Sequence, residues 1–213
     1  VTDPKLEDKS TLLVSMTADS NPDSGQYVIY ALKPIFEKMM WRKHVSVTNF
    51  QKTWSKFKSS NYQHTNIVLI DEFTGSGKTI LGRVKTLKAL FSDKGYEINI
   101  IVKTLFTSEV GKQVVESAGI SFSSLLVIDK GISSFYEGDE LRKKVELMNR
   151  LEDILSKSYE ERSLPSFGYG GTESLYTRDD GNTPNSVFPI FWWPFLRGSS
   201  TRKTLLTRAM TDA

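Results

Sequence analysis

The chain has 213 residues, with 28 Lys and Arg against 25 Asp and Glu, two His and no Cys. This length fits one ordinary domain with a terminal extension. The absence of Cys excludes disulfides, thiolate metal sites and cysteine nucleophiles, and the net charge of +3 is too small to indicate a nucleic-acid binder by itself. No apolar run reaches the roughly 18 residues of a membrane span, and the start lacks a signal-peptide pattern. We therefore expect a soluble, cytoplasmic protein.

Predicted strands and helices alternate over the first 128 residues. Short apolar runs have the pattern of buried strands at 11–16, 66–70, 98–102 and 124–128. Apolar residues at helical spacing predict helices at 27–41, with a kink or a restart at Pro34, and at 48–58, 80–91 and 108–118. This alternation is typical of an α/β fold in which helices flank a parallel sheet.

The last third of the chain differs in composition. A mixed-charge stretch from Asp139 to Arg162 predicts a long helix laid across the sheet or along its edge. Residues 164–213 are rich in aromatics, Gly and Pro, a composition that argues against disorder. We therefore expect a core over 1–163 and an aromatic C-terminal extension over 164–213 that packs on it. The extension ends in a basic tail, a candidate for contact with nucleic acid, which contains Arg197, Arg202, Lys203 and Arg208.

Two acids and a run of small residues follow the strand at 66–70. The acids are Asp71 and Glu72, and after Phe73 come Thr74, Gly75, Ser76, Gly77, Lys78 and Thr79. Small residues let backbone amides approach a phosphate, hydroxyls add donors, and the start of the next helix adds partial positive charge. The acids repel a phosphate, so they are suited to hydroxyls or a divalent cation. A ribose 5-phosphate carries a diol beside its phosphate, so it suits both the small-residue loop and the pair of acids.

Residues 67–79 resemble the phosphoribosyl-pyrophosphate signature of the type I phosphoribosyltransferases. The resemblance implies that Asp71 and Glu72 are catalytic residues that hold the ribose diol and bind Mg²⁺ through water, while residues 74–79 bind phosphate. Three positions depart from the signature: Glu72 stands where Asp is usual, Thr74 where an aliphatic residue is usual, and Gly75 where Thr or Ser is common. The fold that the resemblance implies is the type I phosphoribosyltransferase fold.

Two further segments are candidates for the same ligand. On this resemblance the loop at 17–25, with Asp19, Ser24 and Gly25, corresponds to the family's pyrophosphate-binding loop, where magnesium would separate the acids from the pyrophosphate. Lys103 follows the strand at 98–102 and is a further candidate phosphate ligand; a solvated strand edge is the alternative. The expected reaction is displacement of pyrophosphate at the anomeric carbon of the ribose, which needs positioning and electrostatics rather than a strong base. The sequence does not name the acceptor.

The C-terminal extension carries a second, narrower resemblance. Phe-Gly-Tyr-Gly-Gly at 167–171 and Asn-Thr-Pro-Asn-Ser-Val-Phe-Pro-Ile-Phe-Trp-Trp at 182–193 resemble the tail of phosphoribosyltransferase-like effectors of prokaryotic conflict systems, some of them retron-associated. This implies a role in anti-phage defence, with an aromatic segment in place of the base-binding hood. Tyr169, Trp192 and Trp193 are candidates for stacking on a base or docking a protein or ribonucleoprotein partner. In extended backbone the adjacent Trp192 and Trp193 would point to opposite faces, leaving one exposed.

Two other functions compete with the transferase. Gly75-Ser76-Gly77-Lys78-Thr79 also resembles part of a P-loop nucleotidase motif, although Glu72 stands where that motif needs Gly. The other competitor is a non-catalytic module that senses a nucleotide and docks a partner through its aromatic segment.

Overall fold

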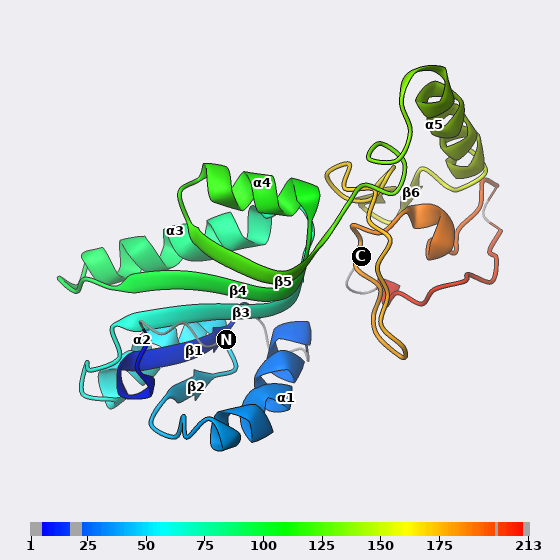
Figure 1. Ribbon diagram of the computed structural model, residues 1–213. Coiled ribbons are helices and arrows are strands. Elements are labelled where there is room, and N and C mark those ends of the chain that lie inside the picture. The colour runs from blue at the N-terminus through cyan, green and yellow to red at the C-terminus, as the bar shows by residue number, and fades with distance from the viewer. Residues whose placement is uncertain (1–5, 18–22, 199, 211–213) are drawn as a thin grey trace.

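The computed structural model describes residues 6–17, 23–198 and 200–210, so Asp19 lies outside the described residues. Its main feature is a sheet of five parallel strands in the order β2-β1-β3-β4-β5 (Figure 1). The strands are β1 (Thr11–Ser15), β2 (Val45–Val47), β3 (Asn66–Thr74), β4 (Asn99–Ser108) and β5 (Ser121–Ile128). This confirms the expected α/β fold with a parallel sheet.

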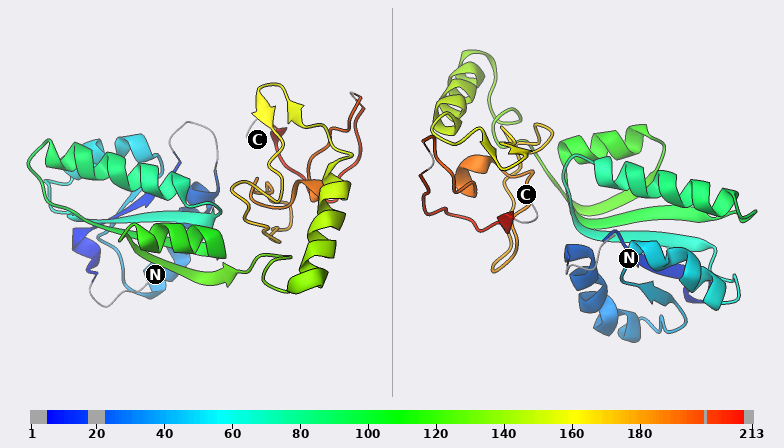
Figure 2. Two further views of the ribbon diagram at one scale, coloured as in Figure 1. Left: turned by 90° about the horizontal axis from the view of Figure 1, so that it is seen from above. Right: turned by 180° about the vertical axis from the view of Figure 1, so that it is seen from behind.

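Helices cover both faces of the sheet (Figures 1 and 2). The helices of this lobe are α1 (Ser24–Lys38), α2 (Thr53–Ser59), α3 (Lys78–Ser92) and α4 (Glu109–Ser117). Alternate strand residues point to opposite faces: Leu12 and Leu69 pack in a core with Phe57 of α2 and Phe91 of α3, whereas Leu13 and Val68 pack against α1. The expected helices are therefore confirmed, and α1 continues through Pro34 without a restart.

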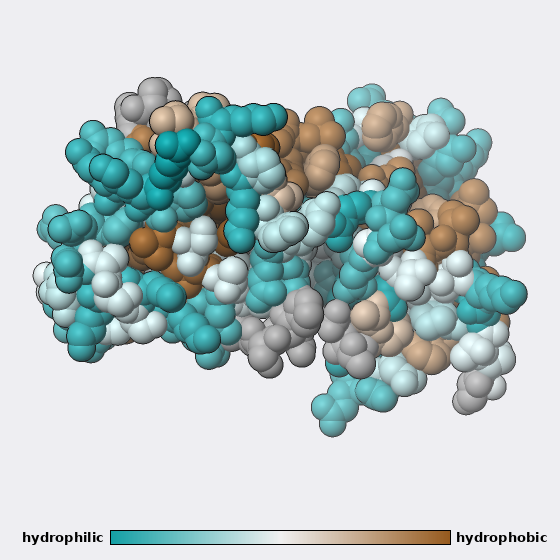
Figure 3. Space-filling model, turned by 90° about the horizontal axis from the view of Figure 1, so that it is seen from below, coloured by the Kyte–Doolittle hydropathy of each residue, from teal (hydrophilic) through white to brown (hydrophobic). Residues whose placement is uncertain are grey.

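The face on the α1 side is only partly covered. β5 is the last strand in the order, and among the described strands none pairs with its outer edge. Near its end Leu125, on the α1 side, is 77% exposed. Val127 and, on the opposite face, Leu126 are also exposed. Figure 3 views the molecule from below, on the α1 side, and shows hydrophobic residues at this surface. No helix among the described residues is long and apolar enough to cross a membrane.

After β5 the chain forms a second lobe, which we define as residues 129–198 and 200–210 (Figure 1). It contains α5 (Gly138–Glu152), a hairpin of β6 (Ser158–Tyr159) and β7 (Arg162–Ser163), and the described part of the C-terminal extension, which we call the C-terminal segment. Its core consists of Leu155, Leu164, Val187, Trp192 and Trp193. The buried Glu173 of the C-terminal segment binds the first residues of this lobe, because its carboxylate accepts hydrogen bonds from the backbone N–H groups of Ile132 (3.0 Å) and Ser133 (2.8 Å).

Two sequence-based expectations about this lobe are wrong. The helix expected from Asp139 to Arg162 ends at Glu152, and α5 lies in the second lobe rather than across the sheet. Beyond α5 the backbone pairs with the C-terminal segment instead: Ser156 N–H donates to the Phe195 carbonyl (2.9 Å), and Arg197 N–H donates to the Ile154 carbonyl (3.1 Å). These long-range bonds replace the helical ones. The division of the chain into domains at residue 163 stays a prediction.

The second wrong expectation is that either Trp192 or Trp193 is exposed. Each is only 1% exposed. The backbone N–H groups of both donate to the Pro189 carbonyl, at 3.1 and 2.8 Å, so the chain turns here and the alternation of extended backbone does not apply. The two rings meet edge to face with centroids 5.6 Å apart, and both belong to the core of the second lobe.

Candidate functional site

The carboxyl ends of β1 and β3 meet where the strand order reverses, since the chain continues from β1 to one side of the sheet and from β3 to the other. Open α/β sheets bind ligands in the crevice at this position. The Met16 N–H donates to the Ile70 carbonyl (3.3 Å) and holds the two strand ends together. The carboxyl ends of β1 and β3 therefore lie side by side, as the resemblance requires.

The loop after β3 is shorter than the sequence predicts. β3 continues to Thr74, with Phe73 opposite Phe106 and Thr74 opposite Thr107 of β4, so Asp71 and Glu72 belong to the strand. Only residues 75–77 connect β3 to α3, and we call them the 75–77 loop. A P-loop needs its residues from position 72 onward to wrap phosphates. Because Glu72, Phe73 and Thr74 belong to β3, and Phe73 and Thr74 pair with β4, these residues do not form a loop that could wrap phosphates, which argues against the P-loop nucleotidase.

Backbone geometry opens the 75–77 loop toward an anion. The Gly75 carbonyl accepts a hydrogen bond from Ser108 Oγ (2.7 Å), which in turn accepts one from the Gly111 N–H of α4 (2.9 Å). In a trans peptide the N–H lies opposite the carbonyl, so the Ser76 N–H points away from α4. Gly77 has a φ of +76° and caps α3 without a side-chain hydrogen bond, which leaves the first amides of α3 for a ligand.

Asp71 is the acid that lines both of the cavities described below. Its carboxylate accepts hydrogen bonds from Ser24 Oγ (2.6 Å) and from the Glu72 N–H (2.8 Å). Burial raises the pKa of Asp71 to about 6; the negative charges of Asp23 and Glu72 add to this effect, and the two hydrogen bonds oppose it. Burial and the neighbouring acids make the charged form of Asp71 unfavourable. A ligand hydroxyl or a cation that contacts the carboxylate would stabilise this charged form.

Glu72 is held by the C-terminal segment. The residue is 7% exposed. Its carboxylate accepts a hydrogen bond from the Tyr176 hydroxyl (2.9 Å) and forms an ion pair with Arg178 Nε (3.2 Å). Tyr176 stacks on Phe73 with centroids 4.8 Å apart. Burial and the Glu72 carboxylate raise the pKa of Tyr176 above its usual value, so its hydroxyl stays a donor at neutral pH. Glu72, longer than the usual Asp, thus reaches across to the second lobe.

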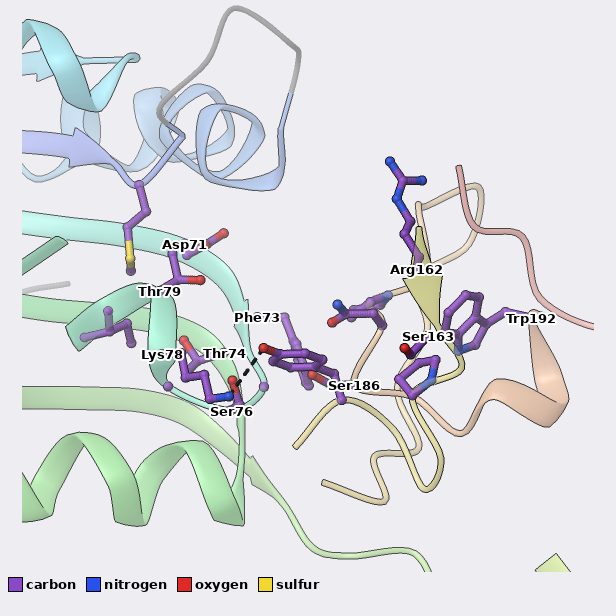
Figure 4. A pocket seen from close by; sticks show the side chains of 18 of the residues that line it. Asp71, Phe73, Thr74, Ser76, Lys78, Thr79, Arg162, Ser163, Ser186 and Trp192 are labelled. Atoms are coloured by element: carbon purple, nitrogen blue, oxygen red, sulfur yellow. Dashed lines mark hydrogen bonds between the residues drawn. The ribbon is translucent and has the colours of Figure 1, made fainter. Parts of the chain in front are cut away.

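A cavity of about 620 Å³ is lined by both the 75–77 loop and the C-terminal segment (Figure 4). Asp71 and residues 73–80 line one wall, and Tyr169, Asn185, Ser186 and both tryptophans contribute to the other. A second cavity of about 420 Å³ adjoins it and shares Asp71, Phe73, Pro184 and Asn185. The second cavity is also lined by Asp23, Ser24, Glu72, Arg178 and Arg208. Each cavity therefore has walls from both lobes.

The structure brings most of the predicted site residues together. Asp71, Thr74, the 75–77 loop, Lys78, Thr79, Tyr169, Trp192 and Trp193 line the first cavity, and Ser24 and Glu72 line the second. Lys78 Nζ lies 3.4 Å from the Tyr169 hydroxyl. Gly25 allows α1 to approach the sheet, because a Cβ there would lie 2.6 Å from Ser15 Oγ and 3.0 Å from the Ile70 carbonyl.

Some candidates are placed elsewhere. Lys103 lines neither cavity, and its ammonium lies 3.3 Å from Ser123 Oγ of β5. Basic residues of the tail make contacts within the second lobe: Arg202 Nε donates to the Trp193 carbonyl (3.1 Å), Arg208 to the Thr183 carbonyl (2.6 Å), and Arg197 pairs with Asp153 (3.2 Å). These bonds help to hold the C-terminal segment in place.

Sequence reasoning missed Tyr176, Arg178, Asn185 and Ser186 as parts of this site. They lie in loops without a periodic pattern, about 100 residues from the acids and glycines they face. The available signal was the pair of departures from the signature, Glu72 and Gly75, since both are residues that contact the C-terminal segment.

The donors around Ser24 fit Mg²⁺. Ser24 Oγ contacts the carboxylates of Asp71 (2.6 Å) and Asp23 (3.3 Å), which brings two acids together. Within the described ranges no group of three or more His, Cys, Asp or Glu could hold a metal ion. Mg²⁺ is usually held by one or two carboxylates together with substrate phosphates and waters, so this oxygen set suits an ion that arrives with a phosphorylated ligand.

Comparison with known proteins shows a family to which the chain is similar. The model of the family PRTase-CE matches residues 2–208, which include both lobes. No curated protein and no solved structure matches the chain. The match confirms, at the level of the family, the resemblances of residues 67–79 and of the C-terminal segment.

Proposed function

The chain belongs to the PRTase-CE family of phosphoribosyltransferase-like conflict-system effectors, and we propose that it binds phosphoribosyl pyrophosphate or a related nucleotide together with Mg²⁺. As part of the same proposal it acts in the cytoplasm as an effector of an anti-phage defence system, for example a retron. The absence of Cys supports this location, since a chain without disulfides needs no oxidising compartment.

One observation carries the proposal: Asp71 and the 75–77 loop line the same cavity. The loop presents backbone amides and the start of α3, which suit a phosphate. Asp71 presents a carboxylate held in place by Ser24, which suits a hydroxyl donor. A ribose 5-phosphate unit carries both groups at a short separation, whereas a simple phosphate ester without a diol uses only the loop.

The chemistry that these residues support is displacement at the anomeric carbon. The bond from this carbon to pyrophosphate breaks, a bond to the acceptor forms, and pyrophosphate leaves with the bonding electrons. When bound, Mg²⁺ neutralises charge on the pyrophosphate; Asp71, Asp23 and Ser24 are the residues that would hold it. Asp71 orients the ribose, and the 75–77 loop fixes the 5-phosphate, so the protein contributes mainly position and charge. Tyr169, beside Lys78, is the exposed aromatic side chain on which an acceptor base would stack.

Thermal unfolding tests this proposal. Phosphoribosyl pyrophosphate with Mg²⁺ should raise the melting temperature, because a ligand at about 100 times its Kd stabilises the native state by about 2.7 kcal/mol. ATP with Mg²⁺ should raise it much less, and Asp71→Asn should remove most of the increase. An equal shift with ATP, or an undiminished shift in Asp71→Asn, would contradict the assignment of the site.

A second candidate is a module that binds the nucleotide without turning it over and docks a protein or ribonucleoprotein partner. The observation in its favour is that Tyr176 and Arg178 engage Glu72, the second acid of the signature. Release of pyrophosphate in the presence of candidate acceptors separates the two: a transferase releases it, whereas the module binds phosphoribosyl pyrophosphate and leaves it intact.

A further inference from the structure

The 75–77 loop lacks a hydroxyl where the signature commonly has Thr or Ser, and the second lobe places one there. A Cβ built on Gly75 would overlap the hydroxyl of Ser186 and lie 2.8 Å from the Ser186 Cβ. The Ser186 hydroxyl therefore fills the space that a side chain at residue 75 would take. Figure 4 shows Ser186 reaching from the C-terminal segment to Phe73 and the loop.

The backbone of Ser186 is held firmly. Its carbonyl accepts hydrogen bonds from Thr172 Oγ1 (2.6 Å) and from the Ser174 N–H (3.2 Å). Gly168 packs so closely that a Cβ there would overlap the same carbonyl. These contacts fix the position of the side chain without using its hydroxyl.

The hydroxyl itself is available to a ligand. Ser186 is 3% exposed and lines the same cavity as Asp71 and the 75–77 loop. Across the described residues the hydrogen bonds of Ser186 are made by its backbone and not by its hydroxyl. Although the residue as a whole is buried, its hydroxyl is open to the cavity, and a phosphate oxygen bound there would give it a charged acceptor.

We propose that Ser186 is a phosphate-binding residue of this site and that its hydroxyl replaces the one missing from residue 75. The proposal rests on the proposed function, since it concerns the phosphate of the same ligand. The hydroxyl donates to a phosphate oxygen beside the backbone amides of the 75–77 loop. The phosphate site is then complete only when the C-terminal segment is docked, so occupancy of the site by a phosphorylated ligand stabilises the contact between the lobes.

Calorimetric titration with ribose 5-phosphate and with phosphoribosyl pyrophosphate, each with Mg²⁺, tests the proposal on the full chain. Ser186→Ala should weaken both by roughly 10- to 100-fold, the effect of one hydrogen bond to a charged group. The matched control is Ser174→Ala, which removes a buried hydroxyl without a hydrogen-bond partner in the described structure, from the same segment but outside the cavity. Ser174→Ala should bind as the unmodified protein does.

A second pair of variants moves the hydroxyl back into the loop. Gly75→Ser alone should disrupt docking of the C-terminal segment, because the new side chain overlaps Ser186. Gly75→Ser combined with Ser186→Gly removes the overlap and should recover most of the affinity lost in Ser186→Ala. The backbone at Gly75 does not have the left-handed φ that would forbid serine.

The outcomes separate the two proposals. If the unmodified protein binds the ligands and Ser186→Ala binds them within twofold as well, Ser186 has only a packing role and the inference is wrong while the proposed function holds. A combined variant that binds no better than Ser186→Ala likewise contradicts the replacement of one hydroxyl by the other. If the unmodified protein binds neither ligand, the proposed function fails, and the assignment of Ser186 fails with it.

Discussion

The two lobes maintain their structures by different means, although both supply walls of the same cavities. In the first lobe, strands and helices follow the apolar periodicity, and most of the buried residues come from regular elements. In the second lobe most of the chain beyond α5 lies in loops, which are held by an aromatic core and by side chains bonded to backbone groups, such as Glu173 to Ile132 and Arg202 to Trp193. The site therefore has one side, with Asp71 and the 75–77 loop, that is fixed by regular secondary structure. Its other side, the C-terminal segment, is positioned by a few specific contacts.

The largest expected effect on stability comes from a change in the aromatic core of the second lobe. Trp193→Ala should cost about 3–5 kcal/mol, since it leaves a cavity at a fully buried position. Hydrogen exchange should then show lost protection over residues 154–198, while β1, β3 and β4 stay protected. Simultaneous loss of protection in both lobes would show that the two lobes unfold as one unit, which would contradict their different dependence on local contacts.

A smaller effect is expected at the contact between the lobes. Glu72→Asp restores the usual residue of the signature but shortens the side chain that reaches Tyr176 and Arg178. We expect a loss of about 1–3 kcal/mol, the range for a buried hydrogen-bonding group left without its partner, and faster proteolysis within residues 164–198. Glu97→Asp, an exposed acid of the first lobe, is the control. Unchanged proteolysis in Glu72→Asp would mean that Glu72 does not anchor the second lobe.

The pH dependence of the unfolding free energy should reveal the raised pKa of Asp71. Its pKa rises from about 3.8 to about 6 on folding, so the native state holds more protons between these values and stability falls as the pH rises through this window. Asp71→Asn should therefore be more stable by about 1–2 kcal/mol at pH 7, less than the ~3 kcal/mol of the full shift because the residue is partly exposed. Chemical denaturation at pH 4 and pH 7 provides the measurement, and an equal difference at both pH values would refute the explanation.

The smallest effect is expected on the open face of the sheet. Leu125→Ser should change the unfolding free energy by less than about 0.5 kcal/mol, because this side chain is largely exposed. Leu69→Ser, on the buried central strand β3, should cost several kcal/mol in the same denaturation assay. Comparable losses would imply that Leu125 is buried in solution.

The sequence predicts the first lobe well because its information is local. The alternation of strands and helices and the run from Asp71 to Thr79 can each be recognised within about ten residues. The end of β3 was missed since pairing with β4, rather than local propensity, extends it to Thr74. In the second lobe, Leu155 and Leu151 have helical spacing, yet bonds from Ser156 to Phe195 end the helix early. Contacts between residues 40 or more positions apart leave no periodic trace in one sequence, and the partners of Glu72 and Gly75 are of this kind.

The open edge of β5 has a practical consequence for work with the purified protein. The strand has the sequence Ser-Phe-Ser-Ser-Leu-Leu-Val-Ile, without the lysine or proline that commonly protects a sheet edge from joining another chain. Short β-prone segments of low charge are also where aggregation begins. Concentrated samples should therefore aggregate slowly through pairing of β5 edges from different molecules. The change Leu126→Lys, at an exposed position of this strand, should slow this aggregation and keep the protein in solution longer for crystallisation.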